Sequence, residues 1–179
     1  ESDAEKIIYA PHDLPDFEGR LIRAFRMAND SAELMLKCPE TISRNRELLH
    51  TIVKIIPLAI YGVVPAMADA DLWVTALLAA NTSVTLSSVP DNLLDEMQGA
   101  FTRRVQKDPD SFFYVPAELR NEDMCIIAAK EFSEALMHIY EWQATERVYI
   151  AAVSSHDVLG MVREKYRTAP VCLAAVKHD

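Results

Sequence analysis

The sequence has few glycines and no short turn motif, and each shortage excludes a class of structure or site. Its four glycines are isolated, with no two within six residues of each other, so neither common glycine-rich phosphate loop is present. The scarcity of glycine, together with the lack of Asn-Gly and Asp-Gly pairs, disfavours a sheet built from tight hairpins. We therefore expect no nucleotide cofactor.

Cysteine and histidine are also sparse. The three cysteines, Cys38, Cys125 and Cys172, are too far apart in sequence to form a metal-binding or redox motif. The five histidines include no pair at helical spacing and no His-Glu-x-x-His motif, so we predict no metal site. Cys125 and Cys172 share one position of a helix and are predicted to be packing residues. The sequence also contains no Asp, Glu or His pair that indicates acid–base catalysis, so we predict no catalytic residue.

Positive charge is in deficit: 18 Lys and Arg stand against 27 Asp and Glu, which gives a net charge of −9. This sign opposes binding to nucleic acid or to an anionic membrane. No basic residue lies between Lys54 and Arg103, and this acidic middle third is a candidate surface for a basic protein partner; the alternative is a solvated face that only aids solubility. Its acidic residues are Asp69, Asp71, Asp91, Asp95 and Glu96.

Long hydrophobic runs are missing too. An uncharged, mostly apolar stretch covers residues 55–68; it is too short to span a bilayer, and two prolines interrupt it. We expect no membrane insertion, and we expect this stretch to form a helix buried on most sides. The chain opens on Glu1 with no basic-then-apolar leader, so we also expect it to be a piece of a longer protein.

An internal repeat is the strongest feature that is present. Three segments align without gaps, each starting with a residue that can cap a helix and each carrying a small alanine seven residues later. The three alanines are 24 and 23 residues apart, and backward steps of 28, 24 and 24 residues reach three earlier units, one of which has Leu93 in place of a cap. The predicted caps are Asn45, Asp69, Asn121, Thr145 and Thr168, and the central residues are Ile52, Ala76, Ala100, Ala128, Ala152 and Ala175.

A second, shorter apolar segment lies between each of these helices and the next, and three of the short segments end in Val-Pro, which stops a helix. The sequence therefore predicts an all-α fold, an α-solenoid-like stack of about six short helical hairpins. We expect one domain over residues 1–179, with 1–44 as a divergent N-terminal cap in which Ser31 caps a helix, and 45–179 as repeats. The alternative is that the valine-rich segments are strands of an α/β fold.

The segment from Ser111 to Lys130, SFFYVPAELRNEDMCIIAAK, resembles the short helical repeat of domain-of-unknown-function family 4116. That repeat has an apolar-aromatic segment, Glu-Leu-Arg, a capping residue and a helix ending in Leu-Ala-Ala-Val-Lys. Thr168–Lys177 is similar to its second half, whereas Glu141–Ala144 departs from Glu-Leu-Arg. The resemblance covers about residues 105–179. It implies a bacterial helical-repeat protein, in the cytoplasm or, for a secreted effector, in a host cell, and it implies no activity.

One aromatic residue breaks the repeat pattern in a way that indicates binding. Trp142 occupies a loop position that holds Glu118 and Lys165 in the neighbouring units, so it is expected to be exposed. Exposed Trp and Tyr are frequent in binding hot spots, and Trp142, Tyr140 and Tyr166 are predicted to form a partner-binding edge. The alternative is that Trp142 folds back into the core. Trp73 follows the buried pattern and is assigned to packing.

These observations favour a non-catalytic protein-interaction module, a scaffold or adaptor of rigid hairpins, with a protein partner that is basic if it binds the acidic third. Three alternatives stay open. One is an acidic inhibitor of the immunity type, which binds a basic partner. Another is a fragment of a cysteine-dependent enzyme with Cys38 as nucleophile. The third is the substrate-recruiting arm of a longer effector.

Overall fold

The computed structural model describes residues 3–11, 16–79 and 84–178. Within these ranges every regular element is an α-helix or a 3-10 helix and none is a strand, which confirms the all-α prediction and excludes the α/β alternative. Backbone contacts divide the chain into two compact units, unit 1 (Glu1–Met97) and unit 2 (Gln98–Asp179). Each unit is described by itself, and the single domain over 1–179 stays a prediction.

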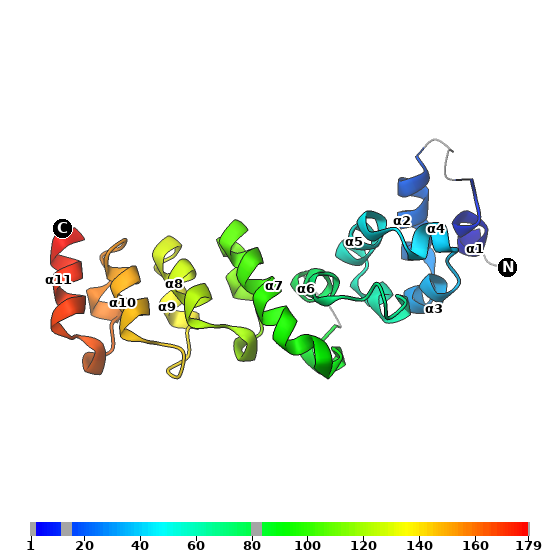
Figure 1. The fold of residues 1–179 in the computed structure, drawn as a ribbon. Coiled ribbons are helices and arrows are strands. Elements are labelled where there is room, and N and C mark those ends of the chain that lie inside the picture. Colours follow the sequence, from blue (N-terminus) through cyan, green and yellow to red (C-terminus); the bar gives the residue numbers. More distant parts are fainter. Residues whose placement is uncertain (1–2, 12–15, 80–83, 179) are drawn as a thin grey trace. The chain divides into compact units, whose positions relative to one another are not determined.

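Unit 1 contains the N-terminal helices and the first predicted hairpin (Figure 1). Its core contains the fully buried Leu21, Phe25 and Ile52. In it α1 packs on α2, α3 packs on η1, and α5 packs on both η1 and α6. Its elements are α1 (Asp3–Ile8), α2 (Phe17–Met27), α3 (Ser31–Leu36), α4 (Glu40–Ser43), α5 (Arg46–Ile55), η1 (Pro57–Gly62), α6 (Ala70–Leu78), η2 (Leu86–Ser88) and η3 (Asp91–Leu93); α7 (Leu94–Lys107) begins here and continues into unit 2.

Two local predictions for unit 1 are wrong. Asp30, not Ser31, caps α3, because its carboxylate accepts hydrogen bonds from the amides of Ala32 and Glu33, at 2.9 and 3.0 Å. The uncharged stretch 55–68 is not a helix buried on most sides. It forms the end of α5, the 3-10 helix η1 and a turn, and a 3-10 helix has three residues per turn, so every third side chain faces the same way. The side chains of Ile55, Leu58, Tyr61 and Val64 are accordingly exposed.

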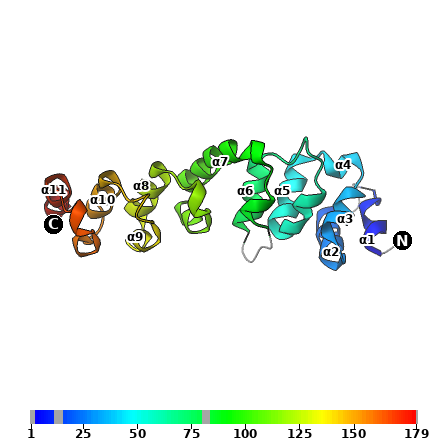
Figure 2. The same ribbon diagram turned by 90° about the horizontal axis from the view of Figure 1, so that it is seen from below.

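Unit 2 contains the repeats that align without gaps in the sequence. In it α10 packs against α8 and against α11, and these three helices lie side by side in both ribbon views (Figure 1, Figure 2). The short valine-rich segments are mostly 3-10 helices. The elements that follow α7 are η4 (Pro109–Tyr114), η5 (Ala117–Leu119), α8 (Glu122–Glu131), α9 (Ala135–His138), α10 (Glu146–Val153), η6 (Leu159–Met161), η7 (Glu164–Tyr166) and α11 (Ala169–His178).

The predicted caps explain where the longer helices begin. Asn45, Asp69, Asn121 and Thr145 each accept a hydrogen bond from the amide three residues later, at 3.0 to 3.4 Å, and this confirms four of the caps. Thr168 lies directly before α11. The central residues Ile52, Ala76, Ala100, Ala128 and Ala152 are buried, so neighbouring helices can approach closely, whereas Ala175 is half-buried.

The first residue of one helix in unit 2 contacts the start of the next helix. The carboxylate of Glu122 on α8 accepts a hydrogen bond from the Thr145 hydroxyl, at 2.6 Å, and forms an ion pair with Arg147 on α10. At the equivalent place on α10, Glu146 accepts a hydrogen bond from the hydroxyl of Thr168 before α11. One polar contact therefore occurs at two successive helix pairs.

Unit 1 has the same contact with the charges exchanged. Arg46, the first residue of α5, forms ion pairs with Asp69, which caps α6, and with Asp71 in the first turn of α6. The two acidic residues thus occupy the places that Thr145 and Arg147 occupy in unit 2. The contact between successive helix starts therefore forms with the acidic residue on either helix. This indicates that the position in the repeat, rather than one particular residue type, determines where the contact occurs.

Candidate partner-binding site

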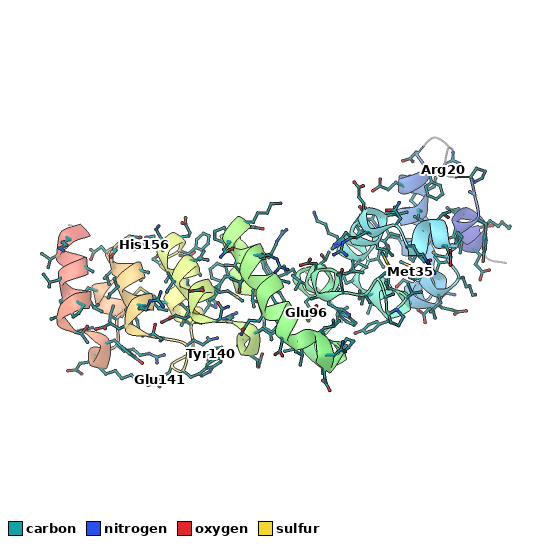
Figure 3. The ribbon with its side chains drawn as sticks, in the orientation of Figure 1. Arg20, Met35, Glu96, Tyr140, Glu141 and His156 are labelled. Atoms are coloured by element: carbon teal, nitrogen blue, oxygen red, sulfur yellow. The ribbon has the colours of Figure 1, made fainter. Side chains whose placement is uncertain are left out.

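Two aromatic side chains lie exposed on the turn between α9 and α10, residues 140–143, which we call the aromatic turn. The side chains of Tyr140 and Trp142 are 56% and 65% exposed. Their rings stack with centroids 6.3 Å apart and planes inclined by 12°. Tyr140 and the adjacent Glu141 lie at one edge of unit 2, and His156 lies at the opposite edge (Figure 3). The expected exposure of Trp142 is confirmed, and the alternative that it folds into the core is wrong.

A buried glutamine fixes the aromatic turn from within. Gln143 is only 6% exposed, and its Oε1 accepts a hydrogen bond from the Tyr140 amide at 3.1 Å. Its Nε2 donates to the carbonyl of Ala117 at 2.8 Å, which ties the turn to the preceding hairpin. The backbone amides of Gln143 and Ala144 both donate to the Tyr140 carbonyl at 3.0 Å. The two rings are therefore displayed by a closed, internally bonded turn.

Sequence reasoning missed Gln143, although a signal for it existed. The equivalent positions in the neighbouring hairpins hold Leu119 and Tyr166, one buried and one half-buried. A glutamine at a position that is apolar in its neighbours must find hydrogen-bond partners once it is buried. The departure of Glu141–Ala144 from the Glu-Leu-Arg pattern is thus the feature that builds the aromatic turn.

Arg120 stabilises the segment that precedes the aromatic turn. The guanidinium of Arg120 donates from Nε to the Val115 carbonyl at 2.9 Å and from Nη1 to the His138 carbonyl at 2.8 Å. The same group lies 4.5 Å from the centre of the Phe112 ring, and burial lowers the pKa of Arg120. Since His138 ends α9, two residues before Tyr140, this arginine holds the segment that leads into the aromatic turn.

Charged residues flank the aromatic turn on the side of the following hairpin. Glu141 forms ion pairs with Lys165 and, at 3.6 Å, with Arg163. The hydrogen bond from Lys165 lowers the pKa of Glu141 and, reciprocally, raises the pKa of Lys165, so both are ionised at neutral pH. Lys165 also lies 5.0 Å over the ring of Tyr166.

Tyr166 does not join the stack of Tyr140 and Trp142. It is half-buried, and its ring contacts that of the buried Tyr149 with centroids 5.0 Å apart. Lys165, which lies over the Tyr166 ring and pairs with Glu141, links it to the aromatic turn. We therefore place Tyr166 at the rim of the site and assign part of its role to packing within unit 2.

The acidic candidates of the middle third, all in unit 1, differ in environment. Asp69 and Asp71 are paired with Arg46, and Asp69 also caps α6, so both have structural roles. Asp91, Asp95 and Glu96 are exposed in the first turns of η3 and α7, where negative charge complements the helix dipole. A binding role for these five residues stays a prediction. It is weaker for Asp69 and Asp71, because both already pair with Arg46.

Cys38 and Cys125 lie in environments that disfavour a thiolate. Cys38 is half-buried, its Sγ lies 3.5 Å from the Leu34 carbonyl, and burial raises its pKa to about 12. Burial also raises the pKa of Cys125 to about 11. A nucleophilic cysteine needs the opposite shift, so the environment of Cys38 counts against the cysteine-dependent alternative. The helix position that Cys125 and Cys172 share with Trp73 and Tyr149 is buried at Cys125, Tyr149 and, as predicted, Trp73, and it is half-buried at Cys172.

Thiol labelling tests this assignment. At neutral pH we expect iodoacetamide to modify the half-buried Cys172 first, and Cys38 and Cys125 only after the protein is unfolded with urea, because both thiols are protonated and shielded. Peptide mass mapping at successive times measures the order. Modification of Cys38 in the folded protein as fast as a free thiol would contradict this assignment and revive the enzyme alternative.

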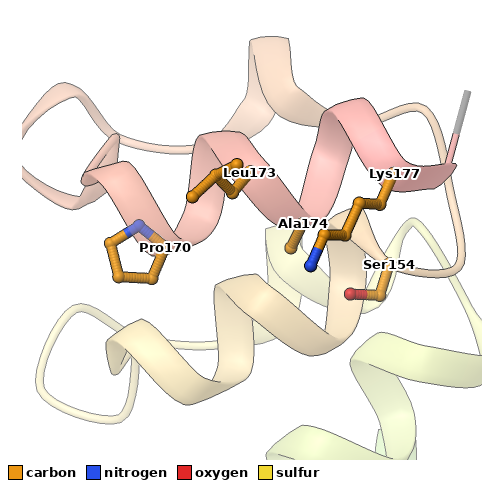
Figure 4. Close-up of a pocket in the computed structure, with 5 residues that line it drawn as sticks. All are labelled: Ser154, Pro170, Leu173, Ala174 and Lys177. Atoms are coloured by element: carbon orange, nitrogen blue, oxygen red, sulfur yellow. The ribbon is translucent and has the colours of Figure 1, made fainter.

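The part of the chain that the structure describes offers little to other kinds of site. There, no group of three or more His, Cys, Asp or Glu is gathered so as to hold a metal ion. None of the described helices combines the length and apolarity needed to cross a membrane. An open groove of about 600 Å³ lies along α11, lined by Ser154, Pro170, Leu173, Ala174 and Lys177 (Figure 4). The groove has one charged side chain, that of Lys177, and none of its lining residues is predicted to bind a partner or to take part in catalysis.

No family model matches the chain, and no curated protein or solved structure matches it either. The resemblance to family 4116 therefore stays a prediction. The aromatic turn is the feature from which the function can be inferred.

Proposed function

We propose that this protein is a non-catalytic interaction module, a scaffold or adaptor, whose helical hairpins stack as an α-solenoid and present the aromatic turn to a protein partner. The observation that supports this proposal is the stacked pair of Tyr140 and Trp142, whose side chains are more than half exposed. The buried Gln143 holds their turn closed. Large aromatic side chains supply most of the energy at many interfaces. A turn that is already ordered loses little entropy on binding.

The repeated helix-to-helix contacts support the stacked arrangement. Glu122 with Thr145, Glu146 with Thr168, and Arg46 with Asp69 join the starts of successive helices at equivalent places. Such local, nearest-neighbour contacts are typical of solenoid proteins, which bind partners along a surface to which each unit contributes. The family resemblance extends the proposal to a bacterial protein in the cytoplasm or, as an effector, in a host cell.

Selection from a displayed peptide library tests the proposal even though the partner is unidentified. The intact protein is immobilised, and the selected peptides are measured against the variant Tyr140→Ala/Trp142→Ala. We expect affinity to fall about thirtyfold, the loss typical of a hot spot worth about 2 kcal/mol. Circular dichroism checks that the variant keeps its helical content.

The matched control is Leu36→Ala. It removes a side chain that is 70% exposed on α3 in unit 1, away from the aromatic turn in sequence, and should leave the affinity unchanged. A selection that enriches no peptide, or peptides that bind the double variant as well as the parent, would refute the aromatic turn as a binding site.

A further inference from the structure

We propose that the aromatic turn binds a proline-rich segment in the polyproline II conformation, with a basic residue of that segment beside Glu118. This inference rests on the proposed function and names the chemistry of its partner. Three features of the turn lead to it: unused hydrogen-bond donors, the spacing of the two rings, and the distribution of charge on either side.

The two aromatic side chains carry polar groups that the protein itself does not use. The indole N–H of Trp142 and the hydroxyl of Tyr140 have no hydrogen-bond partner among the residues described. A partner that supplies free carbonyl groups at the surface would satisfy both donors. A polyproline II segment has no internal hydrogen bonds, so its carbonyls are free, whereas a helix uses its own carbonyls internally.

The stacked rings suit a row of prolines. The ring centroids are 6.3 Å apart and the planes nearly parallel. A polyproline II helix rises about 3.1 Å per residue with three residues per turn, so two of its three edges can rest on one surface. Prolines two residues apart then lie about 6.2 Å apart along the axis and can each contact one ring. The segment is stiff before binding, so ordering it costs little.

The charges beside the turn define the direction of the segment. The bond from Gln143 to the Ala117 carbonyl brings Glu118 next to the aromatic turn, and Glu118 is exposed with no salt bridge in the described part of the chain. On the other side lie Lys165 and Arg163, whose common partner is Glu141. A basic residue of the ligand therefore belongs at the Glu118 end, where an exposed ion pair fixes orientation more than affinity.

The test uses three synthetic peptides labelled at the C-terminus: Arg followed by nine prolines, Glu followed by nine prolines, and Arg followed by a Gly-Ser repeat of equal length. Fluorescence anisotropy with the intact protein measures each affinity. We expect the Arg-proline peptide to bind a few times more tightly than the Glu-proline peptide, since an exposed ion pair contributes up to about 1 kcal/mol. The Gly-Ser peptide should not bind.

Variants locate the binding. Trp142→Ala should weaken the Arg-proline peptide about tenfold or more, Glu118→Lys should reverse the preference for Arg over Glu, and the control Leu36→Ala should change neither. If neither proline peptide binds while library-selected peptides bind at Trp142, the proline-rich ligand is wrong and the interaction module stands. Proline peptides that bind Trp142→Ala unchanged, or a preference that Glu118→Lys does not alter, would overturn the assigned pose.

Discussion

Phe112→Ala is expected to destabilise unit 2 by about 3–5 kcal/mol, the cost of emptying a fully buried aromatic position. The Phe112 side chain is 0% exposed, and its ring lies under the Arg120 guanidinium at 4.5 Å and edge-on to Phe113 at 5.8 Å. The truncation leaves a cavity beneath a half-buried cation. Urea unfolding followed by far-UV circular dichroism measures the loss.

Tyr114→Ala is the matched control for that variant. Tyr114 lies on the same 3-10 helix, two residues later, yet it is 59% exposed, so its truncation should change the free energy of unfolding by less than about 0.5 kcal/mol. Equal losses from the two variants would show that burial of Phe112 does not stabilise unit 2. Because Arg120 also bonds the His138 carbonyl, Phe112→Ala should loosen the segment that leads into the aromatic turn.

The fold could be predicted from the sequence because its signals are local. A cap such as Asn121 or Thr145 bonds an amide three residues away, and a proline ends a helix at its own position, so neither depends on distant residues. The error at Ser31 has the same origin, since Asp30 is an equally good capping residue and stands one position earlier.

Side-chain packing was harder to predict than helix boundaries. The repeat predicts that Ile126, Ile150 and Leu173 fill the seam between neighbouring hairpins, but the first two are only half-buried and Leu173 is 59% exposed. The pairing of Asp69 and Asp71 with Arg46 also escaped charge counting, because it joins helix starts 23 or more residues apart. Such contacts follow from the register between helices, which composition does not contain.

The candidate site likewise combines a feature that the sequence predicts with features that it does not. The exposure of Trp142 followed from its register in the repeat, where the neighbouring units carry charged residues. The supports of the turn, Gln143 and Arg120, bond carbonyls of other hairpins or segments, and their roles emerge only when the fold brings those carbonyls close. Residues that display a site could therefore be predicted, and residues that hold it could not.

Gln143→Ala removes the side chain that holds the aromatic turn closed but keeps the two exposed aromatic rings. It removes the hydrogen bonds to the Tyr140 amide and the Ala117 carbonyl, both of them partly buried, at a cost of about 1 kcal/mol for each bond. We expect a lower free energy of unfolding and, below the unfolding transition, weaker binding of the selected peptides, although both aromatic rings are still present. Urea unfolding and fluorescence anisotropy on the same sample measure the two effects.

Trp142→Ala provides the contrast, because it removes an exposed ring and should weaken binding about tenfold or more while changing stability by less than about 0.5 kcal/mol. Binding lost in both variants, with stability lost only in Gln143→Ala, would mean that a rigid turn, and not merely an aromatic surface, recognises the partner. If Gln143→Ala binds as tightly as the parent protein, the rings suffice without their support. In that case the energetic advantage assigned to the closed turn would be wrong, since a flexible turn would then bind as well as an ordered one.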